Sequence, residues 1–356
     1  MYSRGLIASN LVLYSIVHAL VDASCAVLVL GGLASLSIDA GTLTTMVILY
    51  NVLAFGLQSP LGYLVDRLRI PIVSASAGCL FVTAALFAYS VPLVAVCLAG
   101  VGNALFHVGG GVISLNLAPG KASLPGIYVA PGAFGLTVGI LLGSRGYFNP
   151  WVFSLALVCA AVLIMQVKPP VINYNTDSKA GHKYVGLIIL LLSISICIRS
   201  LVGLVLNFPW KSNIYLLFVL TAAIVLGKAL GGILGDKFGW MRIATAGLII
   251  SAPMLAFGAK NPLIAIVGIL LFNMTMPVTL VAIVNVLPGR AGFAFGLTTL
   301  ALIIGAMPTY TSMKGVLAGS WIILAIVIIS AGLLFIGLKL YNSSGISNLV
   351  KKDVTM

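Results

Sequence analysis

Few side chains of this chain could do chemistry, because only 6 of its 356 residues are acidic and only 3 are histidines. His18 and Asp22 stand four positions apart, so a helix places them on one face, close enough to share a proton. His107, Arg199 and Lys228 also interrupt long apolar runs. Residues of these types could bind a proton at Asp22, with His18, and hold a small molecule by its negative group.

Asp22 and Arg199 are the main candidates for proton coupling and substrate binding, and they could instead form a structural pair. A buried guanidinium without a fixed partner suits a carboxylate or a phosphate, so Arg199 is the first candidate for binding a substrate. Asp22 is the only acidic residue deep in an apolar run and is the candidate for proton coupling. In the structural alternative, Asp22 neutralises Arg199 or His18 as a buried pair, and the sequence leaves this choice open.

Four further polar residues are candidates for binding a substrate, and each has a structural alternative. His107 could be a packed histidine bonded to the backbone, beside the glycines 109–111, which let another helix approach closely. Lys228 could extend its ammonium group to the membrane surface. Asn103 and Asn273 could either hydrogen-bond helices together or line a cavity.

The rest of the composition sets these residues in a membrane. The chain is 61% hydrophobic and 7% charged, with a mean hydropathy of +1.20, whereas a soluble domain is about 25% charged. Apolar runs of about 20 residues are long enough to cross the hydrocarbon as helices. The breaks between them predict an all-α polytopic membrane protein with twelve transmembrane helices, at residues 6–30, 42–65, 70–90, 92–116, 124–143, 149–167, 184–207, 213–235, 242–259, 262–287, 291–312 and 317–340.

The distribution of Lys and Arg predicts the orientation of these helices. Of the 19 basic residues, thirteen fall on the side of the N-terminus, four on the other side, and Arg199 and Lys228 inside spans. Because positive residues favour the cytoplasmic face, we expect both termini in the cytoplasm of a cell-membrane protein. The thirteen are Arg4, Arg67, Arg69, Lys121, Lys168, Lys179, Lys183, Lys237, Arg242, Arg290, Lys339, Lys351 and Lys352.

A short charged turn occurs twice in the chain. Residues 62–67 (Gly-Tyr-Leu-Val-Asp-Arg) recur as residues 232–237 (Gly-Ile-Leu-Gly-Asp-Lys), with Asp66 and Asp236 separated by 170 positions (236 − 66). Ala-Phe-Gly-Leu-Thr likewise occurs in both the fifth and the eleventh spans. Copies that run in the same sense, with six spans each, predict two parallel six-helix repeats. The expected parts are an N-terminal half 1–167, a cytoplasmic linker 168–183, a C-terminal half 184–340 and a cytoplasmic tail 341–356.

The repeated turn resembles the signature of the major facilitator superfamily, a Gly-x-x-x-Asp-Arg-x-Gly-Arg-like loop. In the first copy Leu68 stands in place of the second glycine, and the matching residues are Gly62, Asp66, Arg67 and Arg69. The second copy matches at Gly232, Asp236, Lys237, Gly239 and Arg242. The resemblance implies the major facilitator fold, with a cytoplasmic gate formed by Asp66, Arg67, Asp236 and Lys237.

This superfamily lines its central cavity with the first, fourth, seventh and tenth helices. The resemblance therefore implies that these candidates converge: His18, Asp22, Asn103, His107, Arg199 and Asn273. The fourth span, Asn-Ala-Leu-Phe-His-Val-Gly-Gly-Gly from Asn103, also resembles that of fosmidomycin-resistance-type exporters. The Gly and Pro residues within 126–143 loosely resemble the Gly-Pro motif of antiporters, with a simple packing face as the alternative.

These features predict a secondary active transporter that moves a small anionic or zwitterionic solute by alternating access, coupled to a proton or another ion. The resemblances favour export, but uptake of an organic anion by proton symport fits the buried cations nearly as well. A membrane enzyme acting on a lipid and a receptor of transporter fold are alternatives from other classes.

We expect neither enzymatic activity nor a cofactor or metal site, because no nucleophile or metal set is evident and the sequence has no CxxC and no Cys/His cluster. The absence of a Walker motif argues against ATP as the driving force. The expected partners are the solute, the proton and the lipid bilayer, without nucleic acid, and the expected state is a monomer.

Overall fold

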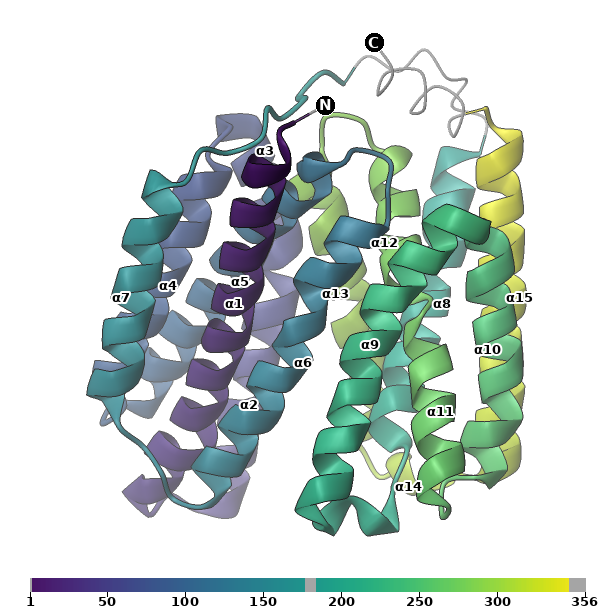
Figure 1. The fold of residues 1–356 in the computed structure, drawn as a ribbon. Helices are drawn as coiled ribbons and strands as arrows, with labels where there is room; N and C mark the ends of the chain where they lie inside the picture. Colours follow the sequence, from purple (N-terminus) through teal and green to yellow (C-terminus); the bar gives the residue numbers. More distant parts are fainter. Residues whose placement is uncertain (1, 177–183, 346–356) are drawn as a thin grey trace. The chain divides into compact units, whose positions relative to one another are not determined.

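In the computed structural model of the chain, residues 2–176 and 184–345 are described, and these two ranges contain helices and no strand (Figure 1). Parts of the predicted linker and tail, residues 177–183 and 346–356, lie outside the described residues, as does residue 1. The helices of the first half are α1 Arg4–Val27, α2 Ala40–Asn51, α3 Gln58–Leu68, α4 Pro71–Phe87, α5 Pro92–Leu117, α6 Ser123–Ser144 and α7 Pro150–Gln166. Those of the second half are α8 Val185–Val205, α9 Ile214–Phe238, α10 Trp240–Phe257, α11 Pro262–Asn273, α12 Met276–Asn285, α13 Ala291–Ala306, α14 Lys314–Leu317 and α15 Ser320–Ser343.

The predicted spans are confirmed as twelve apolar helical stretches in the described ranges. Ten of them have the length and hydropathy to cross a membrane, and the two shorter ones, α4 and α7, have 17 residues each. The second span consists of α2 and α3, joined by the π-helical segment Val52–Gly56. The tenth span consists of α11 and α12, which are separated at Met274 and Thr275.

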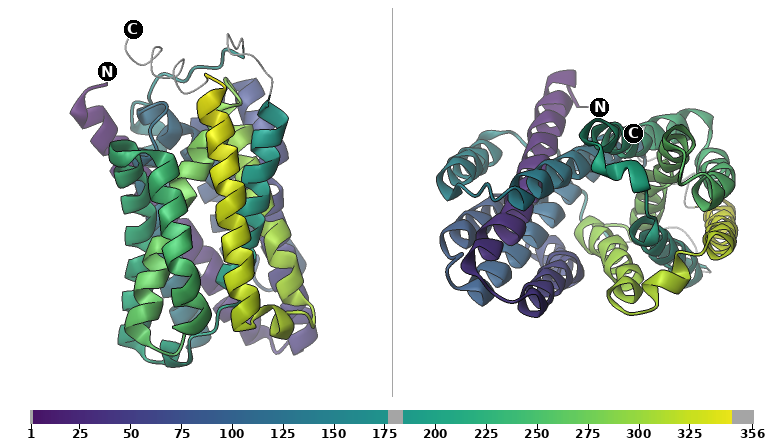
Figure 2. Two further views of the ribbon diagram at one scale, coloured as in Figure 1. Left: turned by 90° about the vertical axis from the view of Figure 1, so that its right-hand side faces the viewer. Right: turned by 90° about the horizontal axis from the view of Figure 1, so that it is seen from below.

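The same pairs of helices pack together in both halves, which confirms the repeat. In the first half α4 packs on α5 and α7, and α1 packs on the same two helices. In the second half α10 packs on α11 and α15, while α8 packs on α12 and α15. Counted as spans, the third contacts the fourth and sixth, and the ninth likewise contacts the tenth and twelfth. Figure 2 shows these helices in two further views.

The chain divides into two compact units, and each unit takes in a short piece of the other half. Unit 1 comprises Met1–Leu117, Pro131–Tyr174 and Gly289–Leu300. Unit 2 comprises Ala118–Ala130, Asn175–Pro288 and Ala301–Met356. Helix α6 therefore begins in unit 2 and continues in unit 1, and α13 does the reverse. The division into the contiguous domains 1–167 and 184–340 stays a prediction.

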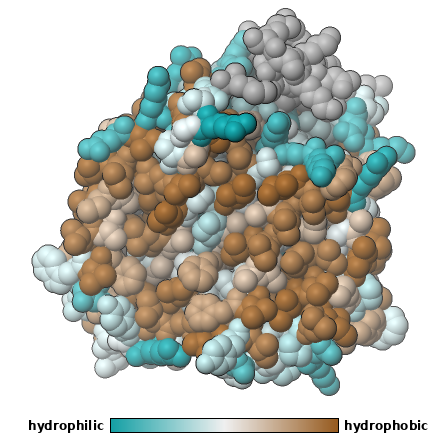
Figure 3. Space-filling view, in the orientation of Figure 1, coloured by the Kyte–Doolittle hydropathy of each residue, from teal (hydrophilic) through white to brown (hydrophobic). Residues whose placement is uncertain are grey.

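Polar and aromatic side chains mark where several even-numbered spans begin. The side chain of Asp39 caps α2, and asparagines 149, 213 and 261 cap α7, α9 and α11 by accepting backbone N–H groups. Trp151, Tyr215 and Trp321 lie in the first turns of α7, α9 and α15 and are largely exposed. Aromatic rings of this kind are typical of a membrane–water interface. Figure 3 shows apolar side chains over the middle of the helices and hydrophilic ones toward their ends.

Candidate functional site

A cluster of two histidines and one aspartate lies inside unit 1. Nε2 of His18 is 3.4 Å from Oδ2 of Asp22, and Nε2 of His107 is 3.5 Å from Oδ1 of the same carboxylate. The two Nε2 atoms are 2.9 Å apart. The exposed fractions of the side chains are 6% for His18, 19% for Asp22 and 11% for His107, so the groups meet largely away from solvent.

Hydrogen bonds within the cluster indicate which nitrogen carries a proton. Nδ1 of His107 is 2.8 Å from the carbonyl oxygen of Asn103. A carbonyl only accepts, so this nitrogen donates, and Nε2 of a neutral His107 is then an acceptor. It follows that Nε2 of His18 donates the proton between the two rings. The Asn103 side chain donates to Oδ1 of Asp22 at 3.1 Å and completes the set.

Helical spacing and small residues bring these groups together. His18 and Asp22 lie one turn apart on α1, as Asn103 and His107 do on α5, and the two helices pack against each other. Gly132 of α6 has no side chain where a Cβ would strike both His18 and Asp22. The next glycines of α6 also let α1 approach, since a Cβ at 135 would meet Ala19. The small-residue face of α6 therefore determines how tightly the cluster is covered.

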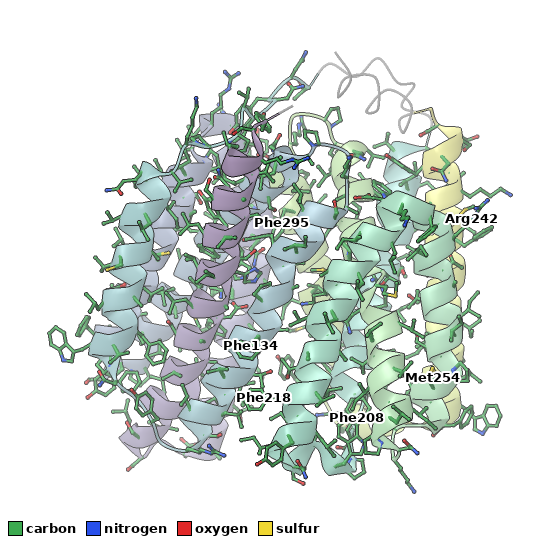
Figure 4. All side chains as sticks on the ribbon, in the orientation of Figure 1. Phe134, Phe208, Phe218, Arg242, Met254 and Phe295 are labelled. Carbon is green, nitrogen blue, oxygen red and sulfur yellow. The ribbon has the colours of Figure 1, made fainter. Side chains whose placement is uncertain are left out.

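The glycines beside His107 have a similar role on the other faces of α5. A Cβ at Gly109 would collide with the backbone of α4 at Pro71 and Ala75. A Cβ at Gly111 would collide with the ring of Phe295, which comes from α13 and is labelled in Figure 4. Close packing on both sides fixes the position of α5 and therefore of its histidine.

Arg199 lies in unit 2 on α8 and is buried among neutral acceptors. Its Nη1 group donates to the hydroxyl of Thr275, Nη2 donates to the hydroxyl of Thr279 at 3.0 Å, and Nε donates to the carbonyl of Ser195 at 3.3 Å. Within the described part of unit 2, no carboxylate forms an ion pair with it. The guanidinium therefore has partners, contrary to the sequence interpretation, but these partners leave its positive charge unneutralised.

The two threonines are functional candidates that the sequence analysis missed. Thr275 stands at the break between α11 and α12, and both hydroxyls donate to carbonyl groups of the same span, at 3.0 to 3.1 Å. Each hydroxyl has one proton and two lone pairs, so its lone pairs are left for Arg199. The spacing of Thr275 and Thr279 by one helical turn, beside Pro277, was the available signal.

The other two predicted binding residues of unit 2 are Asn273 and Lys228. Asn273 donates its amide to Ile269, a carbonyl of its own helix, at 2.9 Å. Lys228 is half-buried on α9, and its backbone carbonyl lies beside Gly126. Unit 1 thus brings together His18, Asp22, Asn103 and His107. In unit 2, Asn273 precedes Thr275, an acceptor of Arg199, by two residues in the sequence. Convergence of all six candidates stays a prediction.

The aspartates of the repeated turn each cap a helix from the opposite half of the sequence. In unit 1, Asp66 accepts from the backbone N–H groups of Gly292 at 2.9 Å and Phe293 at 2.8 Å, where α13 begins. In unit 2, Asp236 accepts from Ala122 and Ser123, both at 2.9 Å, where α6 begins. A carboxylate at a helix N-terminus is favourable because it satisfies N–H groups and faces the positive end of the helix dipole.

The basic residues of the turn do not pair with these carboxylates. Arg67 and Lys237 are exposed, and no ion pair of either occurs among the described residues. Instead, the Lys237 ammonium lies 5.1 Å from the ring centroid of Phe238. Their part in a gate stays a prediction.

The structure corrects the sequence alignment of the first turn. Arg69, rather than Leu68, takes the place of the second glycine of the signature. Arg69 and Gly239 are 170 positions apart, both end a helix, and both have positive φ, 60° and 103° respectively. The signature places glycine there because L-residues rarely adopt this conformation. The Arg69 guanidinium lies 5.4 Å from the ring centroid of Tyr174, a contact that glycine lacks.

Comparison with solved structures identifies the architecture. The fucose:proton symporter FucP of E. coli superposes with a TM-score of 0.64 at 13% identity, over 93% of this chain and 98% of FucP. The human organic anion transporter MFSD10 gives a TM-score of 0.69 at 12% identity, over 96% of this chain and 100% of that protein. A bacterial homologue of the iron transporter ferroportin gives 0.62 at 13% identity, over 96% and 99%.

These similarities establish the fold of the chain. FucP is itself described as a major facilitator superfamily transporter, and each comparison covers nearly the whole of both proteins. The chain is therefore a polytopic helical membrane protein with the major facilitator fold, as its repeated turn predicts. Neither a protein-family model nor a curated protein matches the sequence.

Proposed function

We propose that the chain is a proton-coupled secondary transporter of a small anionic or zwitterionic solute, working by alternating access. The observation that carries the proposal is that this fold contains two separate buried polar sites. One is an acid–base cluster in unit 1, and the other is an arginine in unit 2 that has no counter-charge among the described residues of that unit. Buried ionisable groups in membrane proteins are costly, and they typically mark proton relays and substrate sites.

The cluster suits a coupling proton because its hydrogen bonds change when one more proton binds. In the neutral state, His18 donates to Nε2 of His107 across 2.9 Å. A further proton on that nitrogen would oppose two N–H groups and turn the His107 bond toward Asp22, 3.5 Å away. Because the three groups belong to α1 and α5, such a change alters how these helices contact each other. The Asp22 carboxylate lies 3.4 and 3.5 Å from the two rings, so we propose that Asp22, with His18, holds the coupling proton when His107 passes it on.

Arg199 is the proposed anchor for the negative group of the solute. Its charge is fixed at all physiological pH values, and its planar fork binds a carboxylate or phosphate through two parallel hydrogen bonds. The neutral threonine hydroxyls orient this fork without neutralising it. Asn103, His107, Asn273 and Lys228 complete the proposed binding set.

Direction and setting are further parts of the proposal. Export by proton exchange is slightly favoured by the likeness of the fourth span to fosmidomycin-resistance-type exporters and of the fifth span to the Gly-Pro motif of antiporters. Uptake by symport is the second candidate, favoured by the structural similarity to a fucose:proton symporter. We place the protein in the cell membrane as a monomer with cytoplasmic termini, with Asp66, Arg67, Asp236 and Lys237 forming a gate on that side.

Transport assays on reconstituted protein test the coupling group. A thermal-shift screen of small carboxylates, phosphate esters and amino acids first identifies solutes that stabilise the protein, since a ligand stabilises the state that binds it. Asp22→Asn should then abolish solute-driven proton flux in proteoliposomes, while Asp39→Asn, at an exposed helix cap, should leave it intact. Unchanged proton flux in Asp22→Asn would remove Asp22 from the mechanism.

The same solutes test the proposed anion site. Arg199→Ala should weaken binding of an acidic solute by roughly 10- to 100-fold, on the order of one or two charged hydrogen bonds. Arg199→Lys keeps the charge but loses the fork, and should recover only part of the affinity. Equal affinities in all three proteins would contradict a role of Arg199 in binding.

A further inference from the structure

We infer that His18, Asp22 and His107 form a binding site for a divalent transition-metal ion of the zinc type. The inference concerns binding to the protein itself and does not depend on transport. It revises the expectation of no metal site, which rested on the absence of sequence motifs. The three residues come from two helices, and the most distant pair is 89 positions apart (107 − 18), so no motif spacing could reveal them.

The distances between the potential ligand atoms fit one ion. Zinc binds imidazole nitrogen and carboxylate oxygen at about 2.0–2.2 Å, which places the ligand atoms of a tetrahedron about 3.3 Å apart. The observed separations are 2.9 Å between the two imidazole nitrogens and 3.4 and 3.5 Å from these nitrogens to the carboxylate. A small rotation of the Asp22 carboxylate would bring a single oxygen toward both rings. The ligand atoms of all three residues lie within 4.8 Å of one another.

The hydrogen-bond pattern prepares His107 for coordination. Its Nδ1–H is held by the carbonyl of Asn103 at 2.8 Å, which leaves the lone pair of Nε2 for an ion. Nε2 of His18 coordinates once the ion displaces the proton that it donates between the rings, because metal binding releases protons from its ligands. Histidine ligands of metals almost always donate their second ring N–H to a carbonyl or carboxylate in this way. The Asn103 side chain also bonds Oδ1 of Asp22 at 3.1 Å and so orients the carboxylate.

The donor set determines the class of ion. Two imidazoles and one carboxylate suit Zn²⁺, Co²⁺ or Fe²⁺, whereas Mg²⁺ and Ca²⁺ prefer oxygen ligands alone. Three protein ligands leave a fourth position, as in zinc sites that bind water or a substrate. One carboxylate balances only one of the two positive charges, so an anion is the favoured fourth ligand in this buried setting.

Equilibrium binding of Zn²⁺ and Co²⁺ tests the inference. The protein is purified in detergent without a histidine tag and titrated by calorimetry with Zn²⁺ and by visible absorption with Co²⁺. One ion per chain is expected, together with the d–d bands of tetrahedral Co²⁺. His107→Gln and Asp22→Asn should each lower the affinity for Zn²⁺ about 100-fold or more, because losing only an outer hydrogen-bond partner of a ligand costs about 10–100-fold. Mg²⁺ should not compete.

Two variants separate coordination from folding. His107→Cys replaces one ligand by another, so it should still bind Co²⁺ and add a thiolate-to-cobalt charge-transfer band, which a purely structural effect would not create. His182→Gln removes the one histidine outside the cluster and should bind like the parent. Absence of tetrahedral Co²⁺ bands in the parent would overturn the inference, as would unchanged Zn²⁺ affinity in folded, monodisperse His107→Gln.

Discussion

The fourth and tenth spans are copies of each other, yet they differ one helical turn after their shared asparagine. Asn103 and Asn273 occupy equivalent positions, and four residues later one span has His107 where the other has Pro277. Helix α5 is continuous through its histidine, whereas the tenth span is divided into α11 and α12 just before its proline. A proline has no N–H to donate, so it is compatible with the break that places Thr275 beside Arg199.

The two copies of this span therefore place different side chains at equivalent positions. The unbroken copy carries an ionisable imidazole, and the broken copy places two threonine hydroxyls beside the guanidinium of Arg199. The Asn103 side chain donates to the Asp22 carboxylate, whereas among the described residues the Asn273 side chain donates to a carbonyl of its own helix. The repeated Ala-Phe-Gly-Leu-Thr shows a similar divergence, since Phe295 is buried and Phe134 is exposed (Figure 4).

Introducing or removing proline at positions 107 and 277 should give the largest difference in stability between the two spans. His107→Pro places proline inside α5 and should reduce the free energy of unfolding by at least about 3 kcal/mol. Pro277→Ala, in the first turn of α12, where proline is well tolerated, should change it by less than about 1 kcal/mol. Thermal unfolding in detergent measures both, and His107→Gln controls for loss of the imidazole. Similar losses at the two positions would show that the spans do not differ in the way described.

The two capping aspartates should show a smaller asymmetry. Asp66 is buried and holds two backbone N–H groups, so Asp66→Ala should cost about 1.5–3 kcal/mol of stability. Asp236 is exposed, and water can replace it, so Asp236→Ala should cost about 0.5–1 kcal/mol. The same unfolding assay applies, with Arg67→Ala as an exposed control of little effect. A larger loss at Asp236 would reverse the comparison.

The smallest expected effect is a difference in pH dependence between the helix caps of the second and eighth spans, Asp39 and Asn213. Hydrogen bonds from the Thr42 hydroxyl, and then from the Thr42 backbone N–H, hold the pKa of Asp39 below its ordinary value. Because the folded pKa is lowered, this cap contributes stability above the unfolded pKa, about 4, and loses it as pH falls through the folded pKa. Asn213 caps α9 without titrating. Hydrogen exchange at low pH should therefore accelerate for the first turn of α2 relative to α9, and equal changes would contradict the assignment.

Local features of the fold and site could be predicted from the sequence, because they depend on residues close together in the chain. Runs of apolar residues determine the twelve spans, and four-residue spacing alone places His18 beside Asp22. The approach of His107 to that pair depends instead on the packing of α1 against α5, to which distant residues such as Gly132 contribute. The acceptors of Arg199 could not be predicted either, since they require knowing that the tenth span breaks at Thr275.

Because Asp66 caps α13 and Asp236 caps α6, each half of the sequence supplies a helix cap to the other, which has a consequence for synthesis of the chain. Asp66 is synthesised 226 and 227 residues before the backbone groups that it caps. When the first six spans have left the ribosome, unit 1 therefore still lacks one of its own pieces, the start of α13. Until the eleventh span is translated, the Asp66 carboxylate lacks the two backbone N–H groups that it accepts from in the complete chain. A chain cut after the sixth span would never receive that piece, so unit 1 requires residues from both halves of the sequence.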